Sequence, residues 1–271
     1  MSAPSIHEER YLNLLLDPLE ECAKYKPKFG TNEEDGISLE RFTQMYGDDP
    51  FYHWIGLDCP LMYAAHKAAG GMTSIYRQIG AGCDSLFRAV VQDSLGLTAE
   101  QVHWSYEIEK EDKTTATLTL DARIDLAYVG TNPNFKKRVR EWLDRCGRKL
   151  GLPDERVKQI RGAVFEARQG YKSADAKRQN ADLRFGRNAD AQNYLAVISI
   201  ISTQASHTVI RRYKNAKMLV LTGTKTGNDV DSTYEFFRNV VGFELDKFFE
   251  RNSPVMRKRC INILKQLLAP A

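Results

Sequence analysis

The chain has 271 residues, of which 42% are hydrophobic and 27% are charged, and its formal net charge is +4. This composition is ordinary for a globular protein with a substantial core. The longest apolar run, in YLAVISIIS, is too short to cross a bilayer, so we expect no membrane partner. Five scattered cysteines without a C-x-x-C pair argue against a disulfide framework or a zinc knuckle and favour a reducing, cytoplasmic environment.

The first part of the chain is predicted to be helical. Residues 7–28 carry apolar side chains at helical spacing, and a second, short helix is predicted for 38–46. An aromatic-rich helix follows, and we expect it to end at Gly70-Gly71, because paired glycines are a helix stop. Residues 1–72 are therefore interpreted as an N-terminal helical region.

A hairpin is predicted after the next helix, which covers residues 73–95. The segment HWSYEIEKEDKTTATLTLDARIDLAYVG contains a strand that ends near residue 110, a charged turn and a long second strand. In the second strand, apolar residues alternate with polar residues over 117–125. That period is typical of a strand with one buried face.

Strands and helices alternate in the rest of the chain. The predicted helices are 134–149, 154–160, one within 172–185, one over SHTVIRRYKNA and most of 229–269, and the predicted strands are 162–168, 194–203 and 217–223. Strand–helix–strand–helix–strand order favours a sheet that is covered on both faces and has a parallel component. The sequence therefore predicts an α/β fold with a central mixed sheet flanked by helices.

Two acidic residues lie near the ends of predicted strands. Asp125 follows RI in the second hairpin strand, and Glu166 lies in VFEAR of the next strand. Carboxylate oxygens from neighbouring strand ends can hold one or two Mg²⁺ ions, which bind phosphate oxygens and activate water. Asp121 lies four residues before Asp125 on the same strand face and is an alternative or additional ligand.

The order of hairpin, acidic strand end, E-x-basic strand, helix and apolar strand resembles the core of the PD-(D/E)XK nuclease superfamily, which includes most type II restriction endonucleases. The resemblance covers roughly residues 73–223 and implies a restriction-endonuclease-like catalytic domain over 73–271. It implies Asp125 as the first acid and Glu166 as the second. It also implies an accessory acid on the helix before the hairpin, where Asp84 lies.

One position departs from the pattern of that superfamily. A lysine is expected two residues after the second acid, and this chain has Arg168 there. Arginine can hold a phosphate or stabilise charge in the transition state, but it cannot act as a base. Lys172 or Lys177 could supply the missing lysine, and Gln169 could ligate through water. Whether Arg168 or Lys172 takes the place of the usual lysine stays open.

The stretch KSADAKRQNADLRFGRN, directly after the Glu166 strand, is rich in basic and amide side chains. Arginine and lysine neutralise phosphates, and arginine, glutamine and asparagine can contact base edges. A solvated polar helix is the alternative interpretation. The candidate DNA-binding residues are Lys177, Arg178, Gln179, Asn180, Arg184 and Arg187.

The resemblance implies a Mg²⁺-dependent endonuclease that cuts double-stranded DNA, in the first place a type II restriction endonuclease. A palindromic target implies a homodimer, for which 7–28 and 230–269 are candidate contact surfaces. A repair or structure-specific nuclease of the same superfamily is one alternative. A non-catalytic DNA-binding protein on the same fold is another, which Arg168 favours. In the plainest alternative, Glu166 only forms a salt bridge with Arg123 or Arg168.

Overall fold

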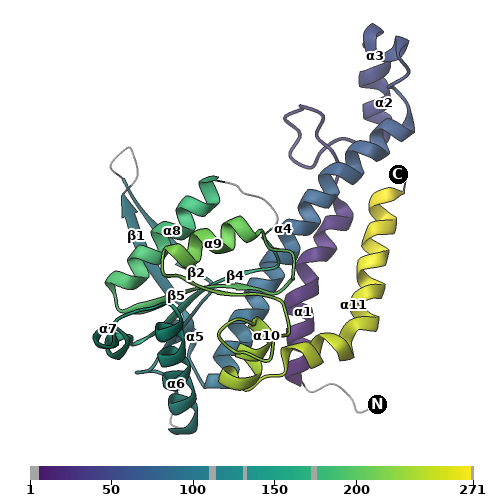
Figure 1. Ribbon diagram of the computed structural model, residues 1–271. Helices are drawn as coiled ribbons and strands as arrows, with labels where there is room; N and C mark the ends of the chain where they lie inside the picture. Colours follow the sequence, from purple (N-terminus) through teal and green to yellow (C-terminus); the bar gives the residue numbers. More distant parts are fainter. Residues whose placement is uncertain (1–5, 110–113, 131–132, 172–175, 270–271) are drawn as a thin grey trace. The chain divides into compact units, whose positions relative to one another are not determined.

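A computed structural model describes residues 6–109, 114–130, 133–171 and 176–269 (Figure 1). The chain forms two compact units. The helical unit comprises Met1–Gly82 and Arg251–Ala271, and the sheet unit comprises Cys83–Glu250. The prediction placed the boundary at residue 72 and assigned the last residues of the chain to the second domain, whereas here Arg251–Ala271 group with the first residues.

The helical unit is built from α1, the short η1, α2, α3, the first part of α4 and the last part of α11. Their bounds are Ile6–Glu20, Glu21–Lys24, Leu39–Gly47, Pro50–Trp54, Pro60–Leu95 and Leu245–Leu268. Within the described residues, no helix combines the length and the apolar character that a membrane span requires.

The prediction that a helix ends at Gly70-Gly71 is wrong, because α4 continues through both glycines. Close packing explains why these two positions are glycine. A Cβ atom on Gly70 would overlap the hydroxyl of Tyr25, and one on Gly71 would lie 2.7 Å from Cδ2 of Leu267. Each glycine therefore admits a neighbouring side chain to the surface of α4.

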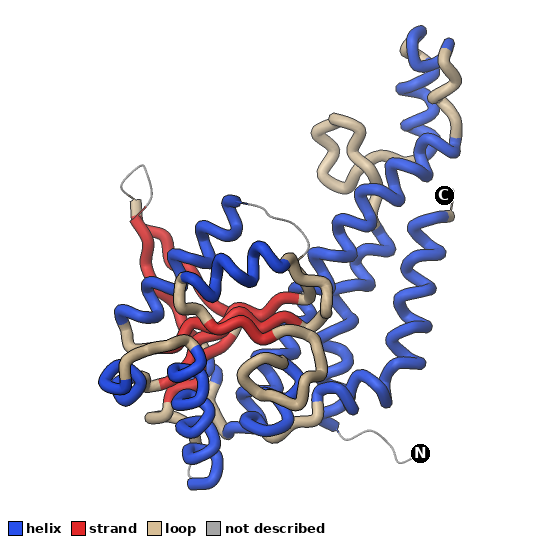
Figure 2. Tube along the Cα trace, in the orientation of Figure 1, coloured by secondary structure: helices blue, strands red, loops and turns tan. Residues whose placement is uncertain are grey.

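Six strands form the sheets of the sheet unit: β1 Trp104–Glu109, β2 Thr115–Leu120, β3 Ala122–Asp125, β4 Gly162–Arg168, β5 Tyr194–Ile200 and β6 Leu219–Leu221. Strands β1 and β2 form an antiparallel hairpin, and the others form a sheet of order β3-β4-β5-β6 (Figure 2). Strand β3 is antiparallel to β4, whereas β4, β5 and β6 are parallel. The predicted α/β class with a mixed sheet is confirmed.

Helices cover both faces of this sheet (Figure 1). The helices of the sheet unit are the end of α4, α5 Ala99–Val102, α6 Pro133–Lys149, α7 Asp154–Gln159, α8 Ala176–Ala191, α9 His207–Asn215, α10 Thr233–Phe236 and η2 Phe237–Val241. Val164 of β4 is buried in one cluster with Phe185 of α8 and Tyr213 of α9. On the other face, the Phe165 ring lies 6.1 Å from that of Trp142 in α6, between ring centroids. Alternation along β4 therefore directs Glu166 and Arg168 to the face of α8 and α9.

The long second strand of the predicted hairpin is two strands with a break at Asp121. Leu120 still pairs with Trp104 of the hairpin, but Ala122 already pairs with Phe165 in the main sheet. At the break, the Asp121 amide donates to the carbonyl oxygen of Phe165 at 3.2 Å. The chain thus changes sheets at an acidic residue that lies beside the end of β4.

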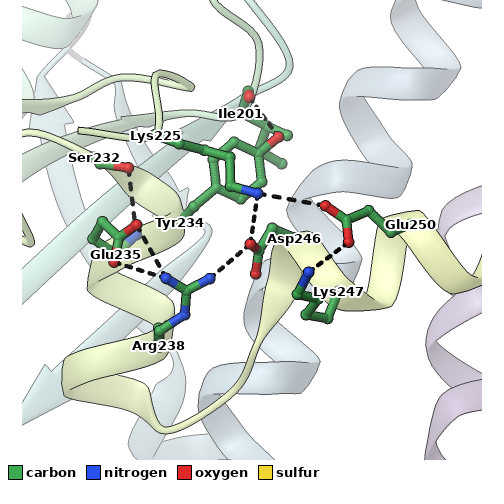
Figure 3. A network of polar contacts seen from close by, with 9 residues as sticks. All are labelled: Ile201, Lys225, Ser232, Tyr234, Glu235, Arg238, Asp246, Lys247 and Glu250. Atoms are coloured by element: carbon green, nitrogen blue, oxygen red, sulfur yellow. Dashed lines mark hydrogen bonds and ion pairs between the residues drawn. The ribbon is translucent and has the colours of Figure 1, made fainter. Parts of the chain in front are cut away.

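An ion-pair network joins the loop after β6 to η2 and the start of α11 (Figure 3). The Asp246 carboxylate accepts from Lys225 Nζ at 2.8 Å and from Arg238 at 2.7 Å. Tyr234 of α10 donates from its hydroxyl to the carbonyl oxygen of Ile201 at 3.0 Å. The ion pairs thus tie η2 and the start of α11 to the loop after β6, and the Tyr234 hydrogen bond ties α10 to the residue after β5.

Candidate functional site

The structure does not place Asp125 beside Glu166. In the antiparallel register, Asp125 lies opposite Gly162, at the start of β4, and Glu166 lies near its end. The prediction that the two acids meet is therefore wrong. Ends of antiparallel neighbours lie at opposite edges of a sheet, so two acids at the ends of successive strands are separated.

Asp125 instead has a complete set of structural partners. Its carboxylate is buried and accepts from Arg161 at 2.6 Å and from the Tyr194 hydroxyl at 2.5 Å. The backbone amide of Ala127 donates to its other oxygen at 2.9 Å. These contacts anchor the end of β3 to the start of β4 and β5, and they leave little capacity for a metal ion.

Asp121, the alternative acid of the sequence, takes the position beside Glu166. Its Oδ2 atom accepts from the backbone amide of Ala167 at 2.7 Å, so the carboxylate lies over the end of β4. Arg88 of α4 donates to the Asp121 carbonyl oxygen at 2.7 Å. The break between β2 and β3 thus places the Asp121 carboxylate in the candidate site, and Arg88 of α4 holds the Asp121 backbone in position.

Arg168 joins Glu166 to helix α8. Its guanidinium lies 2.6 Å from the Glu166 carboxylate and 3.1 Å from that of Asp182. The Glu166–Arg168 salt bridge of the plainest alternative is therefore present. The hydroxyls of Tyr171 and Tyr213 donate to the other Asp182 oxygen at 2.9 and 2.6 Å. Arg168 Nε is buried and has no hydrogen-bond partner among the described residues, so one donor of this guanidinium is unused.

Asp84, Asp121 and Glu166 interact electrostatically, and we call these three residues the acidic cluster. Burial, with the nearby charge of Asp121, raises the pKa of Asp84 to about 7 against the opposing effect of Arg168. Burial raises the pKa of Glu166 to about 8, although Arg168 lowers it, and Asp121 and Asp84 add to the rise. Burial is the main cause of both shifts, so Asp84 and Glu166 hold their protons near neutral pH more readily than exposed carboxyl groups do.

The donor chemistry of the acidic cluster fits Mg²⁺. Carboxylate oxygens are the hard ligands that Mg²⁺ takes, and a divalent cation would stabilise the ionised form of these buried carboxyl groups, whose pKa values burial raises. As the side chains stand in the described part of the chain, no three or more His, Cys, Asp or Glu residues form a ready metal-binding group. Metal binding would therefore require rearrangement of side chains, including the salt bridge of Glu166.

The candidate DNA-binding residues on α8 have different environments. Gln179 is buried, and its side-chain oxygen accepts from Arg212 of α9 at 2.8 Å. Asn180 accepts from the same guanidinium at 2.9 Å. As placed, these two amides join α8 to α9, and their contact with base edges stays a prediction. Arg178 and Arg187 are exposed.

Four other predicted residues lie near the site or outside the described residues. Lys172 lies outside the residues that the structure describes, and Lys177 lies in α8 with its side chain outside that description. Gln169 follows β4 directly and is half-buried, and its carbonyl oxygen accepts from the amide of Ser202 at 3.0 Å. Arg184 is half-buried on α8.

Sequence reasoning missed the residues that complete the site from other elements. Asp182 was read only as part of a polar stretch, and Tyr213 only as part of a helix. Long-range contacts define both roles, since Tyr213 lies 31 residues beyond Asp182. One local signal was available: Asp182 and Phe185 are three residues apart, as in the buried face of a helix.

No family model, no curated protein and no solved structure matches the chain in comparisons with known proteins.

Proposed function

We propose that the protein is a Mg²⁺-dependent endonuclease that hydrolyses phosphodiester bonds in double-stranded DNA. One observation carries the proposal: α4, the β2–β3 junction and β4 bring Asp84, Asp121 and Glu166 to one place, beside Arg168. The order of these residues along a helix, a hairpin and an E-x-R strand is also the reason for proposing a restriction-endonuclease-like fold. Asp121 replaces Asp125 in this assignment.

The proposed reaction is hydrolysis at phosphorus. A water oxygen attacks phosphorus, the bond to the leaving sugar oxygen breaks, and that oxygen takes up a proton. Mg²⁺ bound by the acidic cluster would lower the pKa of the water and neutralise charge on the phosphate. Arg168, which stays protonated, could donate from its guanidinium to a phosphate oxygen in place of the Glu166 carboxylate. Exposed Arg178 would bind the neighbouring backbone.

A type II restriction endonuclease remains the first candidate within this class, acting as a homodimer on a palindromic site. Two active sites related by a two-fold axis would cut one strand each. A repair or structure-specific nuclease is the alternative class, and it would act on an irregular duplex.

Plasmid cleavage tests the proposal. Supercoiled plasmid is incubated with the purified protein, with Mg²⁺ or with a chelator, and the ends of any products are mapped. We expect cleavage in Mg²⁺ only, and loss of cleavage in Glu166→Gln. The matched control is Asp190→Asn, which removes an exposed carboxylate of α8 that is paired with Arg156. Equal cleavage by wild type and Glu166→Gln would refute the assignment.

A non-catalytic DNA-binding protein is the second candidate. The salt bridges of Arg168 with Glu166 and Asp182 favour it, because they hold the second acid of the site without a metal. This candidate predicts DNA binding that falls with rising salt, no cleavage in any divalent cation, and no effect of Mg²⁺ on thermal stability.

A further inference from the structure

A hollow of about 360 Å³ adjoins the candidate site on the face of β4 that α8 covers. It is lined by Tyr106, Leu118, Thr119, Leu120, Glu166, Arg168, Arg178, Ala181, Asp182 and Phe185. These residues come from the hairpin, from β4 and from α8, all within the sheet unit. The hollow therefore shares Glu166 and Arg168 with the site where the phosphate would lie.

The chemistry of the lining changes with depth. Tyr106, Leu120 and Phe185 are buried members of the core cluster, so they form an apolar and aromatic floor. Thr119 and Arg178 are exposed and lie at the mouth. A ligand with a flat apolar body, polar edges and an adjoining negative charge matches this gradient.

We propose that the hollow receives an unpaired nucleobase of the DNA strand that is bound at the acidic cluster. A base attached to a phosphate beside Arg168 would have aromatic rings to pack against and a hydroxyl and a guanidinium at its edge. The size also suits one small ligand, since binding pockets start at roughly 300 Å³.

The inference rests on the proposed action on DNA and names its substrate class more closely. A base inside a regular duplex is stacked and paired, so it reaches such a hollow only after leaving the helix. The protein would therefore prefer DNA with an unpaired nucleotide next to the phosphate. This preference is the property expected of a structure-specific nuclease, and a restriction endonuclease would have to extrude the base from its site.

The test compares two alanine-to-leucine substitutions on the same helix. Ala181→Leu adds bulk inside the hollow, and Ala191→Leu adds the same bulk at an exposed position at the end of α8. Binding is measured by fluorescence anisotropy without divalent cations. The probes are a paired duplex, a duplex with one unpaired adenine, and the same duplex with an abasic site in place of that adenine. Thermal unfolding of each variant checks that it is folded.

We expect the wild-type protein and Ala191→Leu to bind the duplex with the unpaired adenine about tenfold more tightly than the other two probes. Ala181→Leu should bind all three probes equally. If Ala181→Leu keeps the preference, or if the wild type has none, the inference is wrong. Plasmid cleavage by the wild type in that case would leave the nuclease proposal standing. If the wild type binds the unpaired-adenine duplex preferentially but does not cleave plasmid, the result would support the proposed role of the hollow and refute the nuclease proposal.

Discussion

Arg168 has a structural role at the candidate site, in addition to the chemical role that we propose for it. Its ion pairs with Glu166 and Asp182 join the end of β4 to α8, and its side chain is only 19% exposed. Asp182 is still more deeply buried. The fold therefore requires a positive charge at this point, whether or not the site binds a phosphate.

Arg168→Ala should reduce the free energy of unfolding by about 3 kcal/mol, because it leaves the Asp182 carboxylate buried without its ion-pair partner. Arg168→Lys should recover part of this lost stability and part of the cleavage rate. Lysine restores the positive charge, but it lacks the planar guanidinium that contacts both Glu166 and Asp182. Urea unfolding measures the first effect. Arg187→Ala, at an exposed position of α8, is the matched control and should change little. Equal effects of both alanine variants would contradict the structural role.

Asp125 provides a second prediction at the same scale. Asp125→Ala leaves the Tyr194 hydroxyl and the Ala127 amide without an acceptor, so it should reduce the free energy of unfolding by about 3 kcal/mol. Under conditions where Asp125→Ala is folded, it should bind DNA as tightly as the wild type does. Denaturation and anisotropy measure the two quantities. A stable variant with lost DNA binding would show that Asp125 belongs to the functional surface.

At the scale of the elements, the ion-pair network around Asp246 makes the free energy of unfolding depend on pH in the acid range. Burial alone would raise the pKa of Asp246, but hydrogen bonds from Lys225 and Arg238 outweigh it and lower the pKa from 3.8 to about 2. A lowered pKa gives stability that is present above the ordinary value and is lost as the pH falls through the lowered one. The network therefore stabilises the fold fully above about pH 4.

Asp246→Asn should be less stable than the wild type at pH 6, and the difference should shrink as the pH falls from about 4 to 2. Chemical denaturation across this range measures it. Glu250→Gln removes a more exposed partner of Lys225 and should have a smaller effect. A difference that is independent of pH would mean that Asp246 acts through packing and not through its charge.

The elements were largely predictable, but the pairing between them was not. Strand β4 has the predicted bounds, and the hairpin, the parallel strands and most helices follow from apolar spacing. Periodicity does not reveal register, so Asp125 was preferred over Asp121 although the antiparallel pairing separates it from Glu166. Likewise, Gly70 and Gly71 were interpreted as a stop because the side chains that pack on them are distant in sequence.

At the scale of the whole molecule, the predicted homodimer has one candidate surface left. The apolar face of α1 is used within the helical unit, since Leu12, Leu15 and Leu16 are buried. Helix α11 instead exposes apolar side chains at helical spacing: Ile261, Leu264 and Leu268. Exposed apolar stripes of this kind mark interaction surfaces.

Leu264→Lys should therefore convert a DNA-bound dimer to a monomer, because it places a charge in the centre of that stripe. Sedimentation of the DNA complex measures the change. Gln266→Lys, an exposed position two residues away on the same helix, should leave the dimer intact. A wild-type complex that sediments as a monomer and still cuts both strands in one binding event would contradict the dimer.

The most direct test of the acidic cluster compares Asp121→Asn with Asp125→Asn. Single-turnover cleavage of plasmid in Mg²⁺ is measured for both variants, at a temperature where each is folded. We predict that Asp121→Asn lowers the rate by at least about 10²-fold, because it removes charge at the proposed metal site. Asp125→Asn should cleave as the wild type does, because its contacts are structural. The reverse result, with Asp125→Asn inactive and Asp121→Asn active, would contradict the site described by the β3–β4 register.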